Sequence, residues 1–513
     1  MKRTLRRVMW VGWALLLATA LCAQDAALVL QRSVGYGTLK NSNTLTAEKR
    51  AEVEAIEAQT RAASASGRFG DALKFMAKAS AAIRGQEFTP LRALDAALVC
   101  KLDRAVLEPG QSFEVRLSQY FPLDEKPTAK LSAAVVMISI PTEEGTKPVE
   151  TPVKTVADLT PDWNATPLAI KLTVPQLPDG GYRLAITLST SEGGEKDPPV
   201  RKFVALRLGS GLAASVQAAK ARVTHVRGKL AAKDGLLAEL PTSEYRLQLF
   251  DLASSGEVDP ARVDFTQELK DVATALDALE AGRSSLAARR GDFRRAYLSK
   301  VDNTLQPYRA YIPNGYDGSK EFPLVIALHG MGGNENSYFD GYRGSFKVEA
   351  EKRGYLVACP KGRLPASMYT GTAEQDVMDV IAEMRQAYRV DPQRIYLTGH
   401  SMGGFGTWSV SMNHPELFAA LAPIAGGGSP AGMAKIAHIP QIVIHGDNDK
   451  TVPVERSRVM VEAGQKAGAE IKYVEVPGGS HVSIAAPAFP DIFDWFENHK
   501  RPAAQAVSAG SKN

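Results

Sequence analysis

Apolar residues recur with different periods in successive parts of this chain. Up to about residue 92 they follow helical spacing, which predicts a helical hairpin within residues 24–95. Over residues 96–209 the period becomes two, as in Phe113, Val115 and Leu117, and turn-forming residues separate the runs. This part is therefore expected to form a small antiparallel β-sandwich.

Helical spacing returns over residues 210–299, which predicts a helical linker region. Residues 300–500 then alternate short apolar runs with helical patterns. The runs expected to be strands are 324–330, 355–360, 394–399, 418–426, 441–446 and 471–476, and the expected helices are 374–388, 403–413, 454–467 and 487–498. Apolar strands covered by helices indicate an α/β fold with a mostly parallel sheet, whose ligand crevice lies at the carboxyl ends of the strands.

The two ends of the chain differ from its body. Residues 1–23 combine a basic start with an apolar run of about 14 residues, which is typical of a secretory signal peptide and too short for a membrane anchor. Cleavage is expected after Ala20 or Ala23, and the product would be secreted or periplasmic with no stable membrane span. Residues 501–513 are expected to form a disordered tail.

Charge and cysteine content exclude several classes of partner. Removing four basic residues with the signal segment lowers the net charge of +5 to +1, so nucleic acid binding is not expected. The one basic cluster, at Arg289, Arg290, Arg294 and Arg295, is interpreted as a solvated face of a linker helix. Cys100 and Cys359 lie far apart in apolar surroundings, and neither a disulfide nor a metal site is expected. The sequence does not reveal the oligomeric state.

The segment RIYLTGHSMGGFGTW contains Gly399-His400-Ser401-Met402-Gly403 between a predicted strand and a predicted helix. A serine on such a sharp turn is exposed above the sheet, and flanking glycines let the two elements approach closely. Ser401 is therefore the candidate nucleophile. A serine hydroxyl requires a neighbouring base, and the base requires an acid that orients it.

Acid and base follow in the order of an α/β-hydrolase. Of eight histidines, only His481 lies in a loop beyond a late strand and downstream of an acidic loop. Asp449 is the predicted acid, because two further loop residues let it extend towards the histidine. Its competitor Asp447 directly follows a glycine, a position where aspartate commonly caps a turn. Replacing Asp449 with alanine is expected to reduce turnover strongly without unfolding the chain.

Two backbone N–H groups are expected to hold the oxyanion that forms on attack. One belongs to Met402, at the start of the helix after the nucleophile. The other is assigned to Met331 in the glycine-rich loop His329-Gly330-Met331-Gly332-Gly333-Asn334, which could alternatively be only a tight connection. This loop lacks the Gly-Lys-Ser/Thr ending of a phosphate-binding loop.

These landmarks, with LVIALHGMGG, HPELFAALAPIAGG, HGDNDKTVP and GGSH, resemble the esterase branch of the α/β-hydrolase superfamily over residues 305–500. That branch includes polyhydroxybutyrate depolymerase-like, acetylxylan and feruloyl esterases and prolyl-oligopeptidase-like relatives. The resemblance implies Ser401, Asp449 and His481 as a triad, an immunoglobulin-like amino-terminal domain, and no metal or organic cofactor.

Further residues could either take part in the chemistry or serve only in packing. Tyr369, in the loop before helix 374–388, and His400, inside the turn, are candidates for substrate contact. Asp376 is expected to cap or brace that helix. The expected function is an exported serine carboxylic-ester hydrolase acting on short-chain or polymer-linked esters. The alternatives are a prolyl-oligopeptidase-type peptidase and a non-catalytic binding protein with a hydrolase-like shell.

Overall fold

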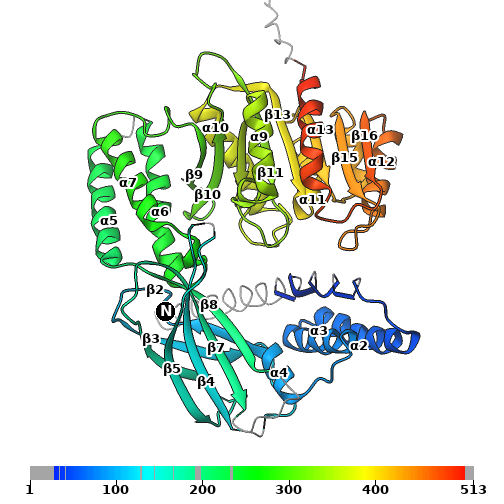
Figure 1. The fold of residues 1–513 in the computed structure, drawn as a ribbon. Coiled ribbons are helices and arrows are strands. Elements are labelled where there is room, and N and C mark those ends of the chain that lie inside the picture. The colour runs from blue at the N-terminus through cyan, green and yellow to red at the C-terminus, as the bar shows by residue number, and fades with distance from the viewer. Residues whose placement is uncertain are drawn as a thin grey trace, which may run out of the picture. The chain divides into compact units, whose positions relative to one another are not determined.

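The computed structural model describes residues 28–502 except 30, 34, 38, 41, 128–129, 144, 166, 191–197 and 231–234. The predicted signal peptide and nearly all of the predicted tail lie outside the described residues. The chain divides into two compact units (Figure 1). The first comprises residues 1–224 and 246–273, and the second comprises 225–245 and 274–513. Of the helices described, none is long and apolar enough to cross a bilayer.

Described helical residues between 28 and 40 precede a helical hairpin in the first unit. The hairpin consists of α2 (Ala47–Ala65) and α3 (Phe69–Ile83), and the shorter helix α4 (Pro90–Ala97) follows it. Thr46 and Thr89 accept a backbone N–H at the starts of α2 and α4, as residues at this position commonly do. Val53 and Ile56 of α2 share a buried cluster with Ala79 of α3, which holds the hairpin together.

Two sheets of the first unit share one apolar core. Their strands are β1 (Leu98–Leu102), β2 (Val106–Leu107), β3 (Ser112–Gln119), β4 (Leu131–Ser139), β5 (Glu150–Leu159), β6 (Leu168–Thr173), β7 (Gly180–Thr190) and β8 (Val200–Leu208). One sheet has the order β1-β3-β6 and the other β2-β8-β7-β4-β5. Phe113 and Val115 of the smaller sheet and Leu184 and Ile186 of the larger lie in the same buried cluster, as their two-residue spacing indicated.

Helices occupy most of the next segment, and a strand ends it. The elements are α5 (Leu212–Lys229), η1 (Leu236–Glu239), α6 (Leu240–Ser254), η2 (Pro260–Arg262) and α7 (Phe265–Glu280). The expectation of helix through residue 299 is wrong at its end, because β9 (Gly291–Leu298) pairs with the following strand. The sheet of the second unit therefore begins before residue 300.

An eight-stranded sheet forms the centre of the second unit. Its other strands are β10 (Leu305–Ile312), β11 (Phe322–Leu328), β12 (Leu356–Pro360), β13 (Val390–His400), β14 (Ala420–Ile424), β15 (Gln441–Gly446) and β16 (Ile471–Val476). The spatial order is β16-β15-β14-β13-β11-β12-β10-β9. The pairs β9–β10 and β10–β12 are antiparallel, whereas β11–β12 and the pairs from β11 to β16 are parallel.

Helices cover both faces of this sheet (Figure 1). They are α8 (Ser337–Asp340), α9 (Ser345–Arg353), α10 (Thr372–Ala387), α11 (Met402–Asn413), α12 (Glu455–Lys466) and α13 (Ala485–Asn498), with the short η3 (Tyr342–Gly344) and η4 (Pro430–Ile436). On β11, Leu324 and Ile326 face the cluster that contains α10, α11 and α12. Val325 and Ala327 face the cluster that contains α9 and α13. This explains the continuous apolar sequence of the strand.

The arginine cluster expected on a solvated helix face lies partly in the sheet instead. Arg294 and Arg295 belong to β9, and Arg295 is buried. Its guanidinium pairs with Glu383 at 3.5 Å and lies 5.4 Å from the ring centre of Tyr308. The interpretation of Arg295 as a solvated side chain is therefore wrong, because a carboxylate and aromatic faces compensate its charge in the interior.

Candidate active site

Ser401 occupies the turn between β13 and α11. Its backbone has φ 59° and ψ −118°, a conformation that costs a non-glycine residue about 1–3 kcal/mol. The neighbouring glycines make this turn possible. A Cβ on Gly403 would lie 1.9 Å from the carbonyl oxygen of Leu328, and one on Gly399 would lie 2.3 Å from that of Gly403. The close contact between strand and helix therefore presents Ser401 at the carboxyl end of β13.

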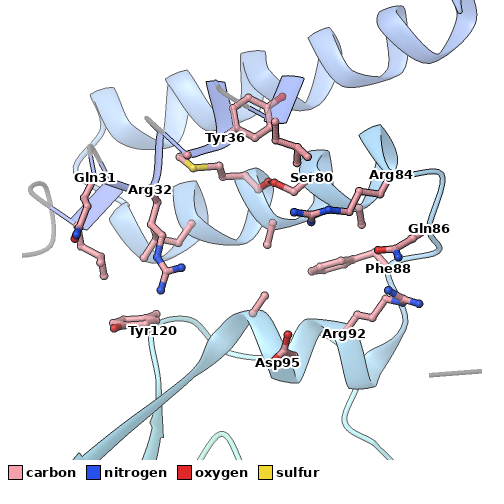
Figure 2. Close-up of a pocket in the computed structure, with 18 residues that line it drawn as sticks. Gln31, Arg32, Tyr36, Ser80, Arg84, Gln86, Phe88, Arg92, Asp95 and Tyr120 are labelled. Carbon is pink, nitrogen blue, oxygen red and sulfur yellow. The ribbon is translucent and has the colours of Figure 1, made fainter. Parts of the chain in front are cut away.

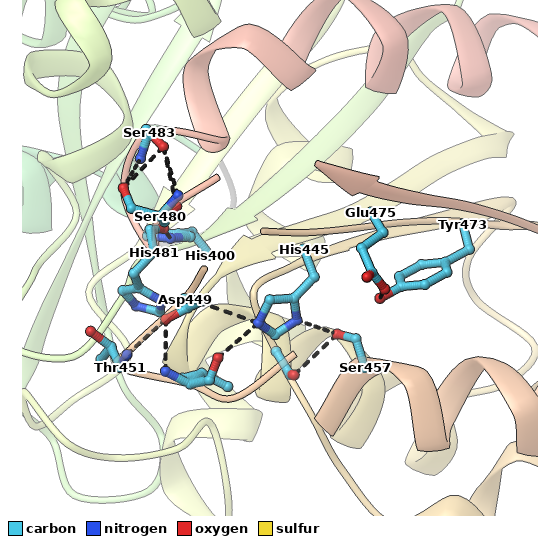
Figure 3. A network of polar contacts seen from close by, with 12 residues as sticks. His400, His445, Asp449, Thr451, Ser457, Tyr473, Glu475, Ser480, His481 and Ser483 are labelled. Atoms are coloured by element: carbon cyan, nitrogen blue, oxygen red, sulfur yellow. Dashed lines mark hydrogen bonds and ion pairs between the residues drawn. The ribbon is translucent and has the colours of Figure 1, made fainter. Parts of the chain in front are cut away.

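Asp449 and His481 meet although they come from separate loops. Asp449 follows β15, His481 follows β16, and Nδ1 of His481 lies 2.6 Å from Oδ2 of Asp449 (Figure 3). The side chain of Asp449 is fully buried, whereas that of His481 is 13% exposed. Since Nδ1–H donates to the carboxylate, Nε2 of the neutral ring keeps its lone pair and can accept a proton.

The competing aspartate has a different partner. Oδ1 of Asp447 accepts the backbone N–H of Gly478 at 2.7 Å. This contact links the loop after β15 to the loop that carries His481, and the carboxylate acts as a turn brace. Asp449, and not Asp447, therefore makes the ion pair with His481.

Several donors converge on the carboxylate of Asp449. Oδ1 accepts the backbone N–H groups of Thr451 and Val452 at 2.8 and 2.9 Å (Figure 3). Burial alone would raise the pKa of Asp449, but hydrogen bonds from His445, His481 and Val452 outweigh burial and hold that pKa well below its ordinary value. The group therefore stays ionised beside His481 at neutral pH.

His445, near the end of β15, is a buried partner of Asp449. Its Nε2 lies 2.9 Å from the carbonyl of Val452 and 3.3 Å from Oδ2 of Asp449. Both neighbours are acceptors, so Nε2 carries the hydrogen. Nδ1 lies 2.7 Å from Oγ of Ser457, which also lies 3.2 Å from the carbonyl oxygen of Gly426. A histidine within the apolar run QIVIHG, four residues before the acid, is the signal that could have identified it.

His400 holds the backbone beside His481. Its Nε2–H donates to the carbonyl of His481 at 2.7 Å, and its Nδ1 faces the hydroxyl of Tyr342 at 3.1 Å. The two imidazole rings lie 4.8 Å apart. Burial, with the nearby His481 ring, lowers the pKa of His400 to about 4, so the ring remains neutral. The expected substrate contact is not supported, because both ring nitrogens are engaged within the protein and the side chain is buried.

The structure brings His481 next to the serine turn without a formed hydrogen bond to the nucleophile. His400, whose ring contacts that of His481, directly precedes Ser401. Within the part of the chain that the structure describes, Oγ of Ser401 makes no hydrogen bond with another residue. Such contacts are often long in the absence of substrate and shorten when it binds.

The glycine-rich loop approaches the serine closely. A Cβ on Gly330 would lie 3.4 Å from Cβ of Ser401. The loop is fixed by the N–H of Gly332, which donates to the carbonyl of Pro365 at 2.8 Å, and by a turn from Gly333 to Gly330. Among the backbone hydrogen bonds of the described turns and loops, none uses the N–H of Met331 or Met402 as donor. Both groups are therefore free to donate to an oxyanion.

Tyr369 lies in the core beneath this loop. Its side chain has no exposed surface, and its hydroxyl donates to the carbonyl of His329 at 3.3 Å. Its ring also fills the space beside Gly362 and Gly406, where an added Cβ would lie 2.6 Å from a ring carbon in each case. The expectation of substrate contact is not supported, because this side chain cannot reach the surface of the site from its position.

Asp376 braces the loop after β12 and does not cap α10, which begins after Gly371. Its carboxylate accepts the hydroxyl of Tyr297 at 2.8 Å and pairs with Nε of Arg363 at 2.8 Å. Burial raises the pKa of Asp376 to about 6, although Tyr297 and Arg363 act in the opposite direction. The group links β9, α10 and the loop that ends at Tyr369.

Comparisons with known proteins match parts of this chain. A family model described as "PET hydrolase-like" matches residues 373–489. The chain is 31% identical over 130 residues to a bifunctional acetylxylan esterase/xylanase of Neocallimastix patriciarum, covering 25% of this chain and 19% of that protein. It is 29% identical over 155 residues to a probable feruloyl esterase C of Aspergillus terreus, covering 29% of this chain and 56% of that protein.

A solved thermostable esterase matches a longer part of the chain. The match covers 78% of this chain and 99% of that one, at 18% identity and a TM-score of 0.39. The chain thus spans about a fifth and about half of the two curated relatives, and both of these proteins are named as esterases.

Proposed function

We propose that this protein is a serine carboxylic-ester hydrolase that acts through an acyl-serine intermediate. The observation that carries the proposal is the buried Asp449–His481 pair next to a strained serine turn. The esterase relatives support the same reaction class. The roles follow from the donors and acceptors: Ser401 is the nucleophile, His481 the general base and Asp449 the group that orients it.

Hydrolysis proceeds in two acyl transfers. Oγ of Ser401 bonds to the ester carbonyl carbon while its proton passes to Nε2 of His481. The bond from carbon to the alcohol oxygen then breaks, and His481 gives the proton to the departing alcohol. Water attacks the acyl-serine, its proton passes to His481, and the acid leaves as the proton returns to Ser401. Asp449 stabilises the imidazolium in both halves of the cycle.

The negative oxygen of each tetrahedral intermediate is assigned to the N–H groups of Met331 and Met402. Met402 is the first residue of α11, where backbone N–H groups have no partner within the helix. The helix dipole adds a favourable potential at the same place. Removing one such donor costs about 3 kcal/mol in enzymes of this type.

An open, partly apolar rim favours short-chain or polymer-linked esters. Between β14 and β15, where larger relatives of this fold can carry a cap, the chain forms only the short helix η4. Val482, next to the base, is 66% exposed, and Leu364, next to the Pro365 that fixes the oxyanion loop, is 61% exposed. Exposed aliphatic groups on either side of a site suit an apolar acyl or polymer surface.

The proposal also covers two further expectations, the nature of the two-sheet part of the first unit and the export of the protein. The two-sheet part of the first unit is proposed to be an immunoglobulin-like domain, and its antiparallel pairing and shared core support this. Export through residues 1–23 is proposed from their composition. An exported enzyme of this kind would meet ester groups on extracellular material.

Pre-steady-state hydrolysis of p-nitrophenyl acetate tests the function. We expect a burst of p-nitrophenol equal to the enzyme concentration, followed by slower turnover, because acylation releases the alcohol first. Ser401→Ala should abolish burst and turnover. A panel of acetyl, feruloyl and hydroxybutyrate esters beside a proline p-nitroanilide then assigns the substrate. Faster cleavage of the anilide would contradict the proposal in favour of a peptidase.

A further inference from the structure

The first unit contains a cavity of about 890 Å³, whereas Ser401, Asp449 and His481 belong to the second unit. Its walls are α3, α4, the described helical residues between 28 and 39, and Tyr120 (Figure 2). The volume falls in the usual range of small-molecule sites, about 300–1,000 Å³. The proposed ester hydrolysis assigns no role to this cavity.

The lining of this cavity carries an excess of positive charge. Arg32 and Arg84 reach it from different helical segments, and neither guanidinium has an ion pair or hydrogen bond with another described residue. Asp95 is the only acidic residue in the described lining, and Lys202 pairs with it at 2.9 Å. The negative charge is therefore already compensated, and the arginines are left to attract an anion.

Aromatic rings accompany the arginines. In Figure 2, Arg32 and Tyr120 lie towards one end of the cavity, and Arg84 and Phe88 lie towards the other. An aromatic face binds the flat or apolar face of a ring, and a guanidinium binds a carboxylate through two parallel hydrogen bonds. The combination discriminates against inorganic anions, which have no ring for Tyr120 or Phe88 to contact.

Polar contacts hold the walls in place. The hydroxyl of Tyr36 donates to Glu57 at 2.8 Å, and Lys40 pairs with the same carboxylate at 2.8 Å. The N–H of Tyr120 donates to the carbonyl of Ala97 at 2.9 Å. These contacts tie the described residues near 36–40 to α2 and tie Tyr120 to α4, so the cavity is preorganised.

We propose that this cavity is an accessory site for a carboxylate borne on a ring with an apolar face. Each end of the cavity pairs one guanidinium with one aromatic ring, Arg32 with Tyr120 and Arg84 with Phe88. The arginine at either end neutralises a carboxylate bound there, and the aromatic residue of that end contacts the ring that bears it. A uronic acid unit of a polysaccharide and an aromatic carboxylic acid share this chemistry. In either case the site binds an acidic group without hydrolysing it, and its occupancy does not require the chemistry at Ser401.

Calorimetric titration of the full chain, in a Ser401→Ala background that prevents turnover, tests this site. The probes are tri-galacturonate and ferulate, each beside a neutral ring compound, xylotriose and coniferyl alcohol. At least one acid should bind, and its neutral counterpart should not. Arg84→Gln should weaken binding at least about tenfold because one charge-assisted hydrogen-bonding group is lost. Adding Arg32→Gln should abolish it.

Arg50→Gln is the matched control, because Arg50 is an exposed arginine on α2 outside the cavity lining. It should leave the affinity unchanged, and none of the three variants should change hydrolysis of p-nitrophenyl acetate when Ser401 is present. Preference for tri-galacturonate identifies a polymer unit, and preference for ferulate identifies an aromatic acid. Absence of binding by both acids at millimolar concentration, equal binding of the neutral compounds, or full affinity in the Arg32/Arg84 double variant would overturn the proposal.

Discussion

Oδ2 of Asp449 lies 2.6 Å from Nδ1 of His481, although 32 residues separate them in the chain. The parallel pairing of β15 and β16 brings their carboxyl ends together, and each loop contributes one partner. The pair fixes the tautomer of His481 with its proton-accepting nitrogen available to substrate.

Asp449→Asn should reduce kcat for p-nitrophenyl acetate by about 10³- to 10⁴-fold, because an amide cannot stabilise the imidazolium and favours the wrong tautomer. Asp447→Asn is the matched control. Its amide oxygen can still accept the N–H of Gly478, and kcat should stay within a few-fold of the parent. A large loss in Asp447→Asn with little loss in Asp449→Asn would reverse the assignment of the acid.

His445→Ala should lower kcat about tenfold with little change in KM. The ring donates to the acceptors around Asp449, so its removal loosens the group that orients the base, and Ser457 loses one of its two buried partners. The unfolding free energy should fall by about 1–3 kcal/mol. His438→Ala is the control, because it removes an exposed histidine whose one hydrogen bond among the described residues is to the carbonyl of Pro415. Equal kcat in the two variants would show that His445 is not a positioning residue.

The histidines of the site should respond differently to acid. Protonation of His481 removes the base, so kcat/KM should fall as the pH decreases from about 8 to about 5. His400 has a pKa lowered to about 4, so it stays neutral across that range and does not contribute to the loss. The pH profile of kcat/KM with a non-ionising ester checks this expectation. A rate that is constant over the range would contradict His481 as the base.

The burial of Asp376 should make part of the stability dependent on pH. Its pKa rises to about 6 on folding, from an ordinary value of about 4, so the folded state holds a proton that the unfolded state releases between these values. The associated stability is present below about pH 4 and is lost as the pH rises through 6, by about 3 kcal/mol. Asp376→Asn should remove this slope. Denaturant unfolding at several pH values tests it, and identical slopes in parent and variant would refute it.

The regular strands and helices of the second unit could be predicted from sequence, because positions with the same environment recur at a fixed spacing along a strand or a helix. Strand 441–446 was expected with the bounds of β15, and helix 403–413 begins one residue late compared with α11. The serine turn could be located because Gly399 and Gly403 are required by local geometry. Such features depend on neighbours in the chain.

The features that the sequence did not reveal depend on distant partners. The interior can accommodate Arg295 of β9 only because Glu383 and Tyr308 lie beside it. No pattern in the local sequence indicates either contact. The role of His445 likewise depends on Ser457 and on the folded loop at Val452. The position of Tyr369 likewise could not be predicted from its loop, which has no periodicity, and the structure shows its side chain fully buried.

Gly403→Ala should destabilise the second unit by more than about 3 kcal/mol, because the new methyl group would lie 1.9 Å from the carbonyl oxygen of Leu328 and the backbone would have to move. Gly228→Ala is the control. Gly228 lies in α5 with no atom within 4 Å of an added Cβ, so alanine should be neutral or stabilise by up to about 1 kcal/mol. Thermal unfolding of both variants measures the difference. A stable Gly403→Ala variant would contradict the tight contact between β11 and α11.

Reaction of the full chain with a fluorophosphonate, followed by peptide mapping, tests whether Ser401 is the activated nucleophile. A phosphonate reacts with a serine only where a base and oxyanion donors activate it. We expect one covalent adduct on Ser401, loss of ester hydrolysis in proportion to labelling, and at least a hundredfold slower labelling in His481→Ala. An adduct on another residue, or ester hydrolysis that persists when Ser401 is fully modified, would show that Ser401 is not the nucleophile.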